Sequence, residues 1–118
     1  MLKPTRKEPD MTDEEMKEKV IEELKKIYDP EIPVNIYDLG LVYNVHCWTD
    51  ALTKLKKCSI KMTLTSATCS MSEVIVDLVR SISYRIEGLE EVDVHLVFDP
   101  PWSQENMSDE AKLQLGLL

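Results

Sequence analysis

Residues 58–98 read CSIKMTLTSATCSMSEVIVDLVRSISYRIEGLEEVDVHLVF and contain the pattern strand, helix, strand. Residues 58–65 and 92–98 alternate between apolar and polar side chains, as half-buried strands do. Between them, a capping box that starts at Ser70 opens a run with apolar residues at helical spacing, and Gly88 ends this run. Such a helix returns the chain along the sheet, so we expect the two strands to be parallel neighbours joined by a right-handed crossover.

The flanking segments extend this unit in both directions. Thr12-Asp13-Glu14-Glu15 is a capping box that begins a first helix. Residues 41–49 alternate and form a hairpin with the strand that follows them, and Ser108 caps a short last helix over 109–115. The order α-β-β-α-β-α predicts a two-layer α+β domain, in which a small mixed three-stranded sheet packs on helices.

Length and composition restrict the class of protein. A chain of 118 residues suits one domain and is too short for two, so we expect a single domain over 12–118 behind a disordered, charged tail, 1–11. The first ten residues have no apolar core of a signal sequence, and no apolar stretch approaches the ~20 residues that a membrane span needs. We therefore expect a cytoplasmic protein with no membrane contact.

The charge balance argues against nucleic acid as a partner. Lys and Arg number 14 against 22 Asp and Glu, which gives a net charge of −8. Binding to a phosphate backbone needs clustered cations. The one basic cluster, Lys54, Lys56 and Lys57, lies in a predicted turn and is interpreted as a solvated loop.

The three cysteines differ in their predicted surroundings. An odd number without a secretion signal indicates reduced thiols rather than a disulfide framework. Cys47 and Cys58 fall on the core-facing side of their strands and are expected to be inert. Cys69 directly precedes the Ser70 cap, where the amides and dipole of a helix start favour a thiolate. From position alone, Cys69 is either a functional thiol or a loop cysteine without a role.

Carboxylates in loops bounded by proline or glycine form a second set of candidates: Asp29, Glu31, Asp38 and Asp99. Such carboxylates can cap backbone amides, bind a metal or transfer protons, and capping is the commonest role. Because parallel strands leave a sheet at the same end, we expect Asp38, Thr65 and Asp99 to lie together around Cys69. No pair of cysteines or histidines has the spacing of a zinc site.

Two features point to a partner. Six residues are predicted to face outward, on a side of the sheet that the helices need not cover: His46, Trp48, Thr63, Thr65, His95 and Val97. Trp102 follows two prolines after the third strand. It is either exposed for a partner or folded back with the last helix to close the core.

Four motifs resemble a known family. They are DPEIPVNIYDLGLVY at 29–43, MTLTSATCSM at 62–71, FDPPW at 98–102 and MSDEAKLQLGL at 107–117. Together, over about residues 12–117 and in matching order, they resemble the SufT and PaaD-like group of iron-sulfur cluster assembly proteins, which includes the targeting subunit of the eukaryotic cytosolic iron-sulfur assembly machinery. Four motifs at fitting intervals are far more specific than any one pattern.

The resemblance implies a compact, often dimeric α+β domain that helps to assemble iron-sulfur clusters or to deliver them to recipient proteins, and that is not an enzyme. The family's characteristic cysteine falls on Cys69. Its other motif positions fall on Asp29, Glu31, Asp38, Thr65, Asp99 and Trp102. Relatives often have Ala-Pro-Gly before the cysteine and Pro or Gly after it, whereas here Ser66-Ala67-Thr68 precedes and Ser70 follows.

A complete cluster takes four ligands, and this chain offers one expected reactive thiol. We therefore expect Cys69 to hold a transient iron-sulfur cluster or iron, with a second copy in a homodimer, glutathione or a client protein supplying the other ligands, and no permanently bound cofactor. One alternative is an adaptor that docks assembly machinery to its clients and binds no iron. A weaker alternative is a thiol enzyme with Cys69 as nucleophile, because neither His46 nor His95 is expected beside it.

Overall fold

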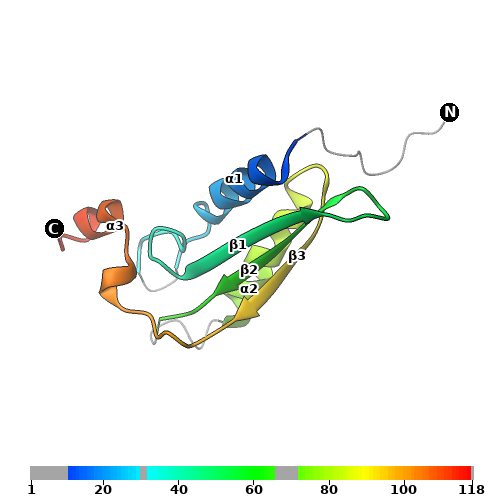
Figure 1. Ribbon diagram of the computed structural model, residues 1–118. Coiled ribbons are helices and arrows are strands. Elements are labelled where there is room, and N and C mark those ends of the chain that lie inside the picture. The colour runs from blue at the N-terminus through cyan, green and yellow to red at the C-terminus, as the bar shows by residue number, and fades with distance from the viewer. Residues whose placement is uncertain (1–10, 30–31, 66–71, 118) are drawn as a thin grey trace.

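The computed structural model describes residues 11–29, 32–65 and 72–117. Its elements, in chain order, are α1 (Asp13–Leu24), β1 (Val42–Thr49), β2 (Lys56–Met62), α2 (Ser72–Arg80), the 3-10 turn η2 (Ser81–Tyr84), β3 (Leu89–Leu96), the 3-10 turn η3 (Gln104–Asn106) and α3 (Asp109–Gln114). The strands form one sheet in the order β1-β2-β3 (Figure 1). The predicted α+β fold class and element order are confirmed.

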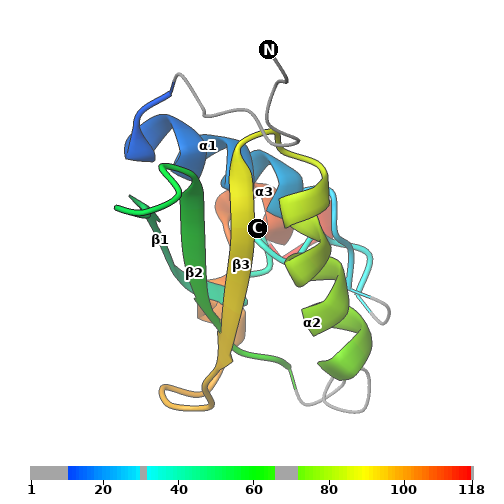
Figure 2. The same cartoon turned by 90° about the vertical axis from the view of Figure 1, so that its right-hand side faces the viewer.

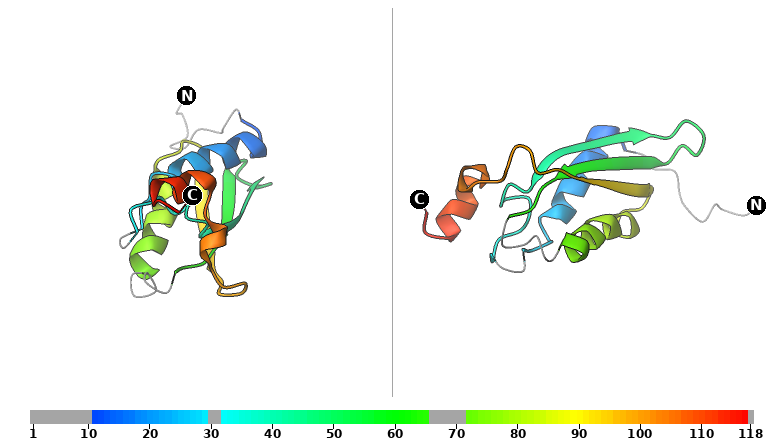
Figure 3. Two further views of the ribbon diagram at one scale, coloured as in Figure 1. Left: turned by 90° about the vertical axis from the view of Figure 1, so that its left-hand side faces the viewer. Right: turned by 90° about the horizontal axis from the view of Figure 1, so that it is seen from below.

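The sheet is mixed, as predicted. β1 pairs with β2 antiparallel, and β2 pairs with β3 parallel. α1 and α2 lie on the same side of the sheet, and α3 lies beyond one end of it (Figure 3). Figure 2 shows α2 running alongside β3. No helix in the described part of the chain is long and apolar enough to cross a membrane.

α1 begins at the predicted capping box. The Thr12 hydroxyl accepts the Glu15 N–H at 3.1 Å, and the Glu15 carboxylate accepts the Thr12 N–H at 3.0 Å. The face turned to the sheet is fully buried and consists of Met16, Val20 and Leu24. Of the predicted N-terminal tail, the structure describes only Met11, which packs against the core. The Ser70 capping box lies outside the described residues.

β2 ends at Met62, three residues earlier than the alternation predicts. Thr63 and Thr65, predicted to face outward, are instead buried, at 1% and 3% exposure. The Thr63 N–H donates to the Leu41 carbonyl at 2.8 Å, which continues the antiparallel register of the Val42–Met62 pair by one residue. An outward position in the alternation therefore does not mean exposure here, and the prediction that these two threonines lie on an uncovered face was wrong.

The basic cluster is also not a solvated loop. Lys56 begins β2 and is buried, with its Nζ 2.7 Å from Asp13 Oδ1 and 2.6 Å from Thr49 Oγ1. Lys57 Nζ lies 3.2 Å from a carboxylate oxygen of Asp50. Of the three lysines, Lys54 remains in an exposed turn. Carboxylates compensate the other two: Asp13 of α1 for Lys56, and Asp50 of the same hairpin for Lys57.

Cys47 and Cys58 face the core, as predicted, but they are not reduced. They are direct cross-strand partners on β1 and β2 and are joined by a disulfide. The prediction of three free thiols was wrong for this pair, because a composition argument ignores the strand register that places two thiols side by side. The bond encloses a short loop, since the two cysteines are 11 residues apart in the sequence.

We predict that the denatured, unreduced protein contains one titratable thiol per chain and that the reduced protein contains three. Replacing both Cys47 and Cys58 by Ala should lower the free energy of unfolding by about 2–3 kcal/mol, because a loop of this length loses its constraint on the unfolded chain. Thiol titration and urea unfolding measure the two effects. Three thiols in unreduced protein would contradict the disulfide.

Asp50 provides a pH-dependent contribution to stability. Its carboxylate accepts the backbone N–H groups of Thr53 and Leu52 and pairs with Lys57, and these contacts lower the pKa of Asp50 to about 2. A carboxyl whose folded pKa lies below its unfolded value of about 3.9 stabilises the fold above about pH 4, and this contribution is lost as the pH falls towards 2.

We therefore expect Asp50→Asn to lose less stability between pH 4 and pH 2 than the wild type loses. Urea midpoints measured across this range test the prediction. Parallel pH profiles for the two proteins would show that Asp50 is not responsible.

Candidate functional site

Three loops meet at one end of the sheet, which we call the exit end because β2 and β3 both finish there. Val42 at the start of β1 pairs with Met62, and Met62 pairs with Leu96 at the end of β3. The loop before β1 and the segments after β2 and β3 therefore lie together (Figure 1). This arrangement was predicted from the topology, and it is confirmed for Asp38, Thr65 and Asp99.

Hydrogen bonds fasten the segment after β3 onto the loop before β1. The Trp102 indole N–H donates to the Leu39 carbonyl at 2.7 Å, and the Tyr43 hydroxyl donates to the Pro100 carbonyl at 2.7 Å. The backbone N–H of Ser108 donates to the Asp38 carbonyl at 2.8 Å. The two motifs thus form one unit, although about 60 residues of chain separate them.

Of the two interpretations of Trp102, the one in which it folds back to close the core is confirmed. It is half-buried and packs against the hydrophobic core. Met107 and Ala111, in the segment leading into α3 and in α3 itself, are also part of that core. The Asp-Pro-Pro-Trp turn closes the exit end, and its indole is not a free contact for a partner.

The carboxylates of the loop before β1 build the loop itself. Asp29 is buried, and its Oδ1 accepts the Ile32 N–H at 2.8 Å. Asp38 Oδ2 accepts from the Asn35 side-chain amide at 2.8 Å, while the Asp38 N–H donates to Asn35 Oδ1 at 2.9 Å. Asp29 thus has the amide-capping role that is commonest for such residues, whereas the Asp38 carboxylate holds the Asn35 side chain that caps the Asp38 N–H.

Of the other four predicted site residues, the structure describes two, Asp99 and Thr65. Asp99 is exposed, immediately after β3 at the exit end. Thr65 is buried there. Cys69 and Glu31 lie outside the described residues. Among the described residues, no group of three or more His, Cys, Asp or Glu side chains is arranged to hold a metal ion.

The two histidines are exposed on the side of the sheet away from α1 and α2, as predicted. The His46 ring stacks on Trp48, with 5.4 Å between ring centroids. His95 Nε2 lies 3.1 Å from Asp93 Oδ2 on the same strand. Each imidazole thus has a neighbour from its own strand.

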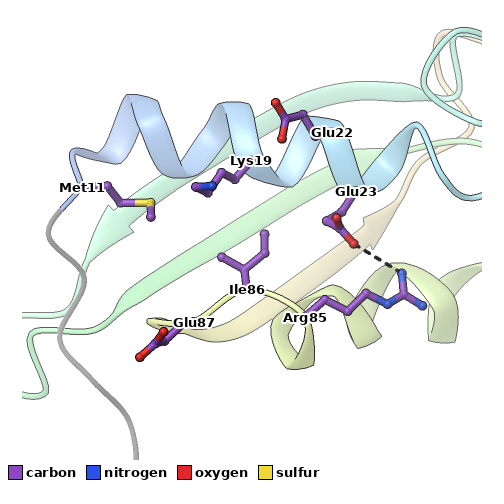
Figure 4. Close-up of a pocket in the computed structure, with 7 residues that line it drawn as sticks. All are labelled: Met11, Lys19, Glu22, Glu23, Arg85, Ile86 and Glu87. Carbon is purple, nitrogen blue, oxygen red and sulfur yellow. Dashed lines mark ion pairs between the residues drawn. The ribbon is translucent and has the colours of Figure 1, made fainter.

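A cavity of about 320 Å³ lies away from the exit end, between α1 and the turn that leads into β3 (Figure 4). Charged side chains of both signs surround it, and Arg85 lies 3.9 Å from Glu23 across it. None of the residues of the four motifs lines it. In the described part of the chain, the motif residues therefore gather at the exit end and not in this cavity.

Sequence reasoning missed the residues that hold the loops together. Tyr43 and Asn106 had no assigned role, and Ser108 was expected only to cap the last helix, yet all three contact the facing loop. Gly40 has a φ of +84°, and a Cβ there would overlap the Asn106 backbone carbonyl. The sequence contained part of the information needed to find these contacts, because Gly40 and Ser108 lie in the motifs at 29–43 and 107–117.

Comparison with known proteins gives consistent matches. Residues 17–96 match the family described as iron-sulfur cluster assembly protein. The chain is 41% identical over 101 residues to the "Fe-S protein maturation auxiliary factor" of Porphyromonas gingivalis, covering 86% of this chain and 91% of that protein. It is 36% identical over 91 residues to the "Fe-S protein maturation auxiliary factor SufT" of Staphylococcus aureus, covering 77% of this chain and 98% of that protein.

The fold is also that of a solved structure. A domain of unknown function, DUF59, from Bacillus anthracis superposes with a TM-score of 0.72 at 38% identity. The match covers 90% of this chain and 96% of that one. Sequence and structure therefore point to the same group of relatives.

We predict that Gly40→Ala lowers the free energy of unfolding by about 2–5 kcal/mol, because Ala is strained at positive φ and its methyl group would collide with the Asn106 carbonyl. Gly116→Ala is the matched control. Gly116 also has a positive φ, of +76°, but a Cβ there meets open space, so we expect a loss of only about 1–2 kcal/mol. Urea unfolding compares the two variants, and equal losses would contradict the close contact between the loops.

Proposed function

The chain belongs to the iron-sulfur cluster assembly protein family, and we propose that it is an auxiliary factor in the maturation of iron-sulfur proteins. In this proposal Cys69 is a transient ligand of iron or a cluster, or the thiol that contacts a client. The protein works in the cytoplasm with the assembly machinery and recipient apo-proteins.

One observation carries the proposal: the motif loops meet at the exit end. Cys69 follows Thr65 by four residues along the chain, and Thr65 lies where the loop before β1 and the segment after β3 are fastened together. A thiol supplied there would have the exposed Asp99 carboxylate at the same end of the sheet. Thiolate and carboxylate are both ligand types that iron accepts.

The disulfide limits which cysteine can be the proposed ligand of iron or a cluster. Cys47 and Cys58 are bonded to each other and buried, which leaves Cys69 as the remaining cysteine of the chain. One thiol cannot supply the four ligands of a cluster. We therefore propose that any cluster is shared, with a second copy in a homodimer, glutathione or the client completing its coordination. No permanently bound cofactor is required.

The second candidate is an adaptor that docks the assembly machinery to its clients without binding iron. The adaptor is favoured by the hydrogen bonds of Asp29 and Asp38. Their carboxylate oxygens accept hydrogen bonds within their own loop, so they stabilise the loop rather than bind iron in this candidate function. A thiol enzyme is the weakest candidate, because the similar proteins are named as maturation auxiliary factors. We propose that the chain is not an enzyme.

Anaerobic reconstitution with iron and sulfide, followed by visible absorption, tests the proposal. We expect less than one cluster per chain in the wild type and none in Cys69→Ser, because the single thiolate is lost. The control is the double variant Cys47→Ala, Cys58→Ala, which should still bind. A cluster that persists in Cys69→Ser would contradict the role of Cys69, and no absorption in the wild type would favour the adaptor.

A further inference from the structure

β3 is an edge strand with unused backbone groups. It pairs with β2 on one side, and no other strand in the described residues pairs with it. The Val97 N–H donates to the Met62 carbonyl of β2 at 2.8 Å. Because successive residues of a strand present their N–H and C=O groups to opposite edges, Val94 and Leu96 present theirs to the free edge. This edge can accept another strand.

A groove runs beside that edge. Two adjoining hollows, of about 590 and 360 Å³, lie between α2 with η2 on one side and β3 on the other. They share Asp77 and Arg80, and together they follow β3 from Glu90 to Leu96. Figure 2 shows α2 alongside β3 over this length. The groove leaves room for an extended chain next to the free edge.

The side chains around the groove alternate in character. Glu91 and Asp93 are exposed and point to the face of the sheet that the helices leave open. Val94 and Leu96 alternate with them; Val94 is partly buried and Leu96 is exposed, and Val76 of α2 lines the groove with Leu96. A strand added at this edge would have carboxylates beside it on the open face of the sheet and apolar groups beside it on the face that the helices cover.

The charge of the groove favours a basic occupant. Its lining includes five carboxylates and a single cation, Arg80; the carboxylates are Glu73, Asp77, Glu90, Glu91 and Asp93. Lys57 lies 3.4 Å from Glu90 and 3.9 Å from Glu91, and His95 lies 3.1 Å from Asp93, so the negative charge is only partly balanced. Edge-to-edge pairing of two copies of β3 would bring these carboxylates opposite each other, which is destabilising.

We propose that the free edge of β3 and its groove bind an extended, basic segment of a partner protein as a fourth strand of the sheet. The backbone of this segment bonds to Val94 and Leu96. Its cationic side chains face Glu91 and Asp93, and its alternate, apolar side chains face Leu96 and Val76. This docking mode gives affinity through main-chain bonds and specificity through the alternating side chains. It goes beyond the proposed function and does not involve Cys69.

The test uses the full chain and the peptide acetyl-Lys-Val-Lys-Val-Lys-Val-Lys-amide, with binding measured by calorimetry. The first control is the same peptide N-methylated at alternate residues. It keeps its charge but loses the backbone N–H groups along one edge of the extended peptide. We expect its affinity to fall at least about tenfold, because several main-chain hydrogen bonds to β3 are lost. Equal affinity for the two peptides would overturn the proposal by showing attraction of charge alone.

Two variants test the protein side. Glu91→Lys with Asp93→Lys should weaken binding at least about fivefold, since two attractions become repulsions. The matched control, Glu14→Lys with Glu18→Lys, makes the same change of charge on exposed positions of α1 and should bind as the wild type does. Equal weakening by the two pairs would overturn the proposal.

Amide hydrogen exchange tests the proposal on the wild-type protein, so the result does not depend on whether a variant folds. On peptide binding, exchange at Val94 and Leu96 should slow, whereas exchange at Val97, already bonded to β2, should change least. Slowing confined to other elements would overturn the proposal. Cys69→Ser should bind the peptide normally, so failure of this inference and failure of the proposed function are separable.

Discussion

The parallel pairing of β2 with β3 is the constraint on which the rest of the molecule depends. A parallel neighbour requires the chain to return along the sheet, and α2 with η2 makes that return. Both strands then finish at one end, and the antiparallel β1 starts there. Met62 shows the arrangement at a single position, because it pairs with Val42 on one side and with Leu96 on the other. Three loops meet as a result.

Many of the motif residues maintain the shape of those loops. Asp29 and Asp38 accept hydrogen bonds inside their own loop, and the Trp102 indole closes the exit end over the Leu39 carbonyl. Gly40 allows Asn106 to approach where a side chain would collide. Among the described motif carboxylates, Asp99, Asp109 and Glu110 are exposed, and Cys69 is the proposed thiol. The family signature is therefore largely a signature of loop geometry.

Local patterns predicted what depends on local physics, namely the α1 capping box, the order of the elements and the inward parity of Cys47 and Cys58. Predictions failed where a distant segment decides the outcome. Thr63 and Thr65 are buried at the exit end, where the loop before β1 and the segment after β3 meet, and Lys56 is buried because Asp13 of α1 compensates it. The disulfide depends on which residues pair across the hairpin; alternation gives the face of each cysteine, but the pairing also depends on the geometry of the turn.

The central claim is that the Cys69 thiol lies with the other motifs at the exit end. Energy transfer from tryptophan to an acceptor attached to Cys69 tests it most directly, with Trp48→Phe and Trp102→Phe leaving one donor each. Trp48 pairs with Lys57 at the start of β2, whereas Trp102 lies at the exit end. If Cys69 lies at the exit end, transfer from Trp102 is stronger than transfer from Trp48. Stronger transfer from Trp48 would place Cys69 away from the motif loops and contradict the proposed site.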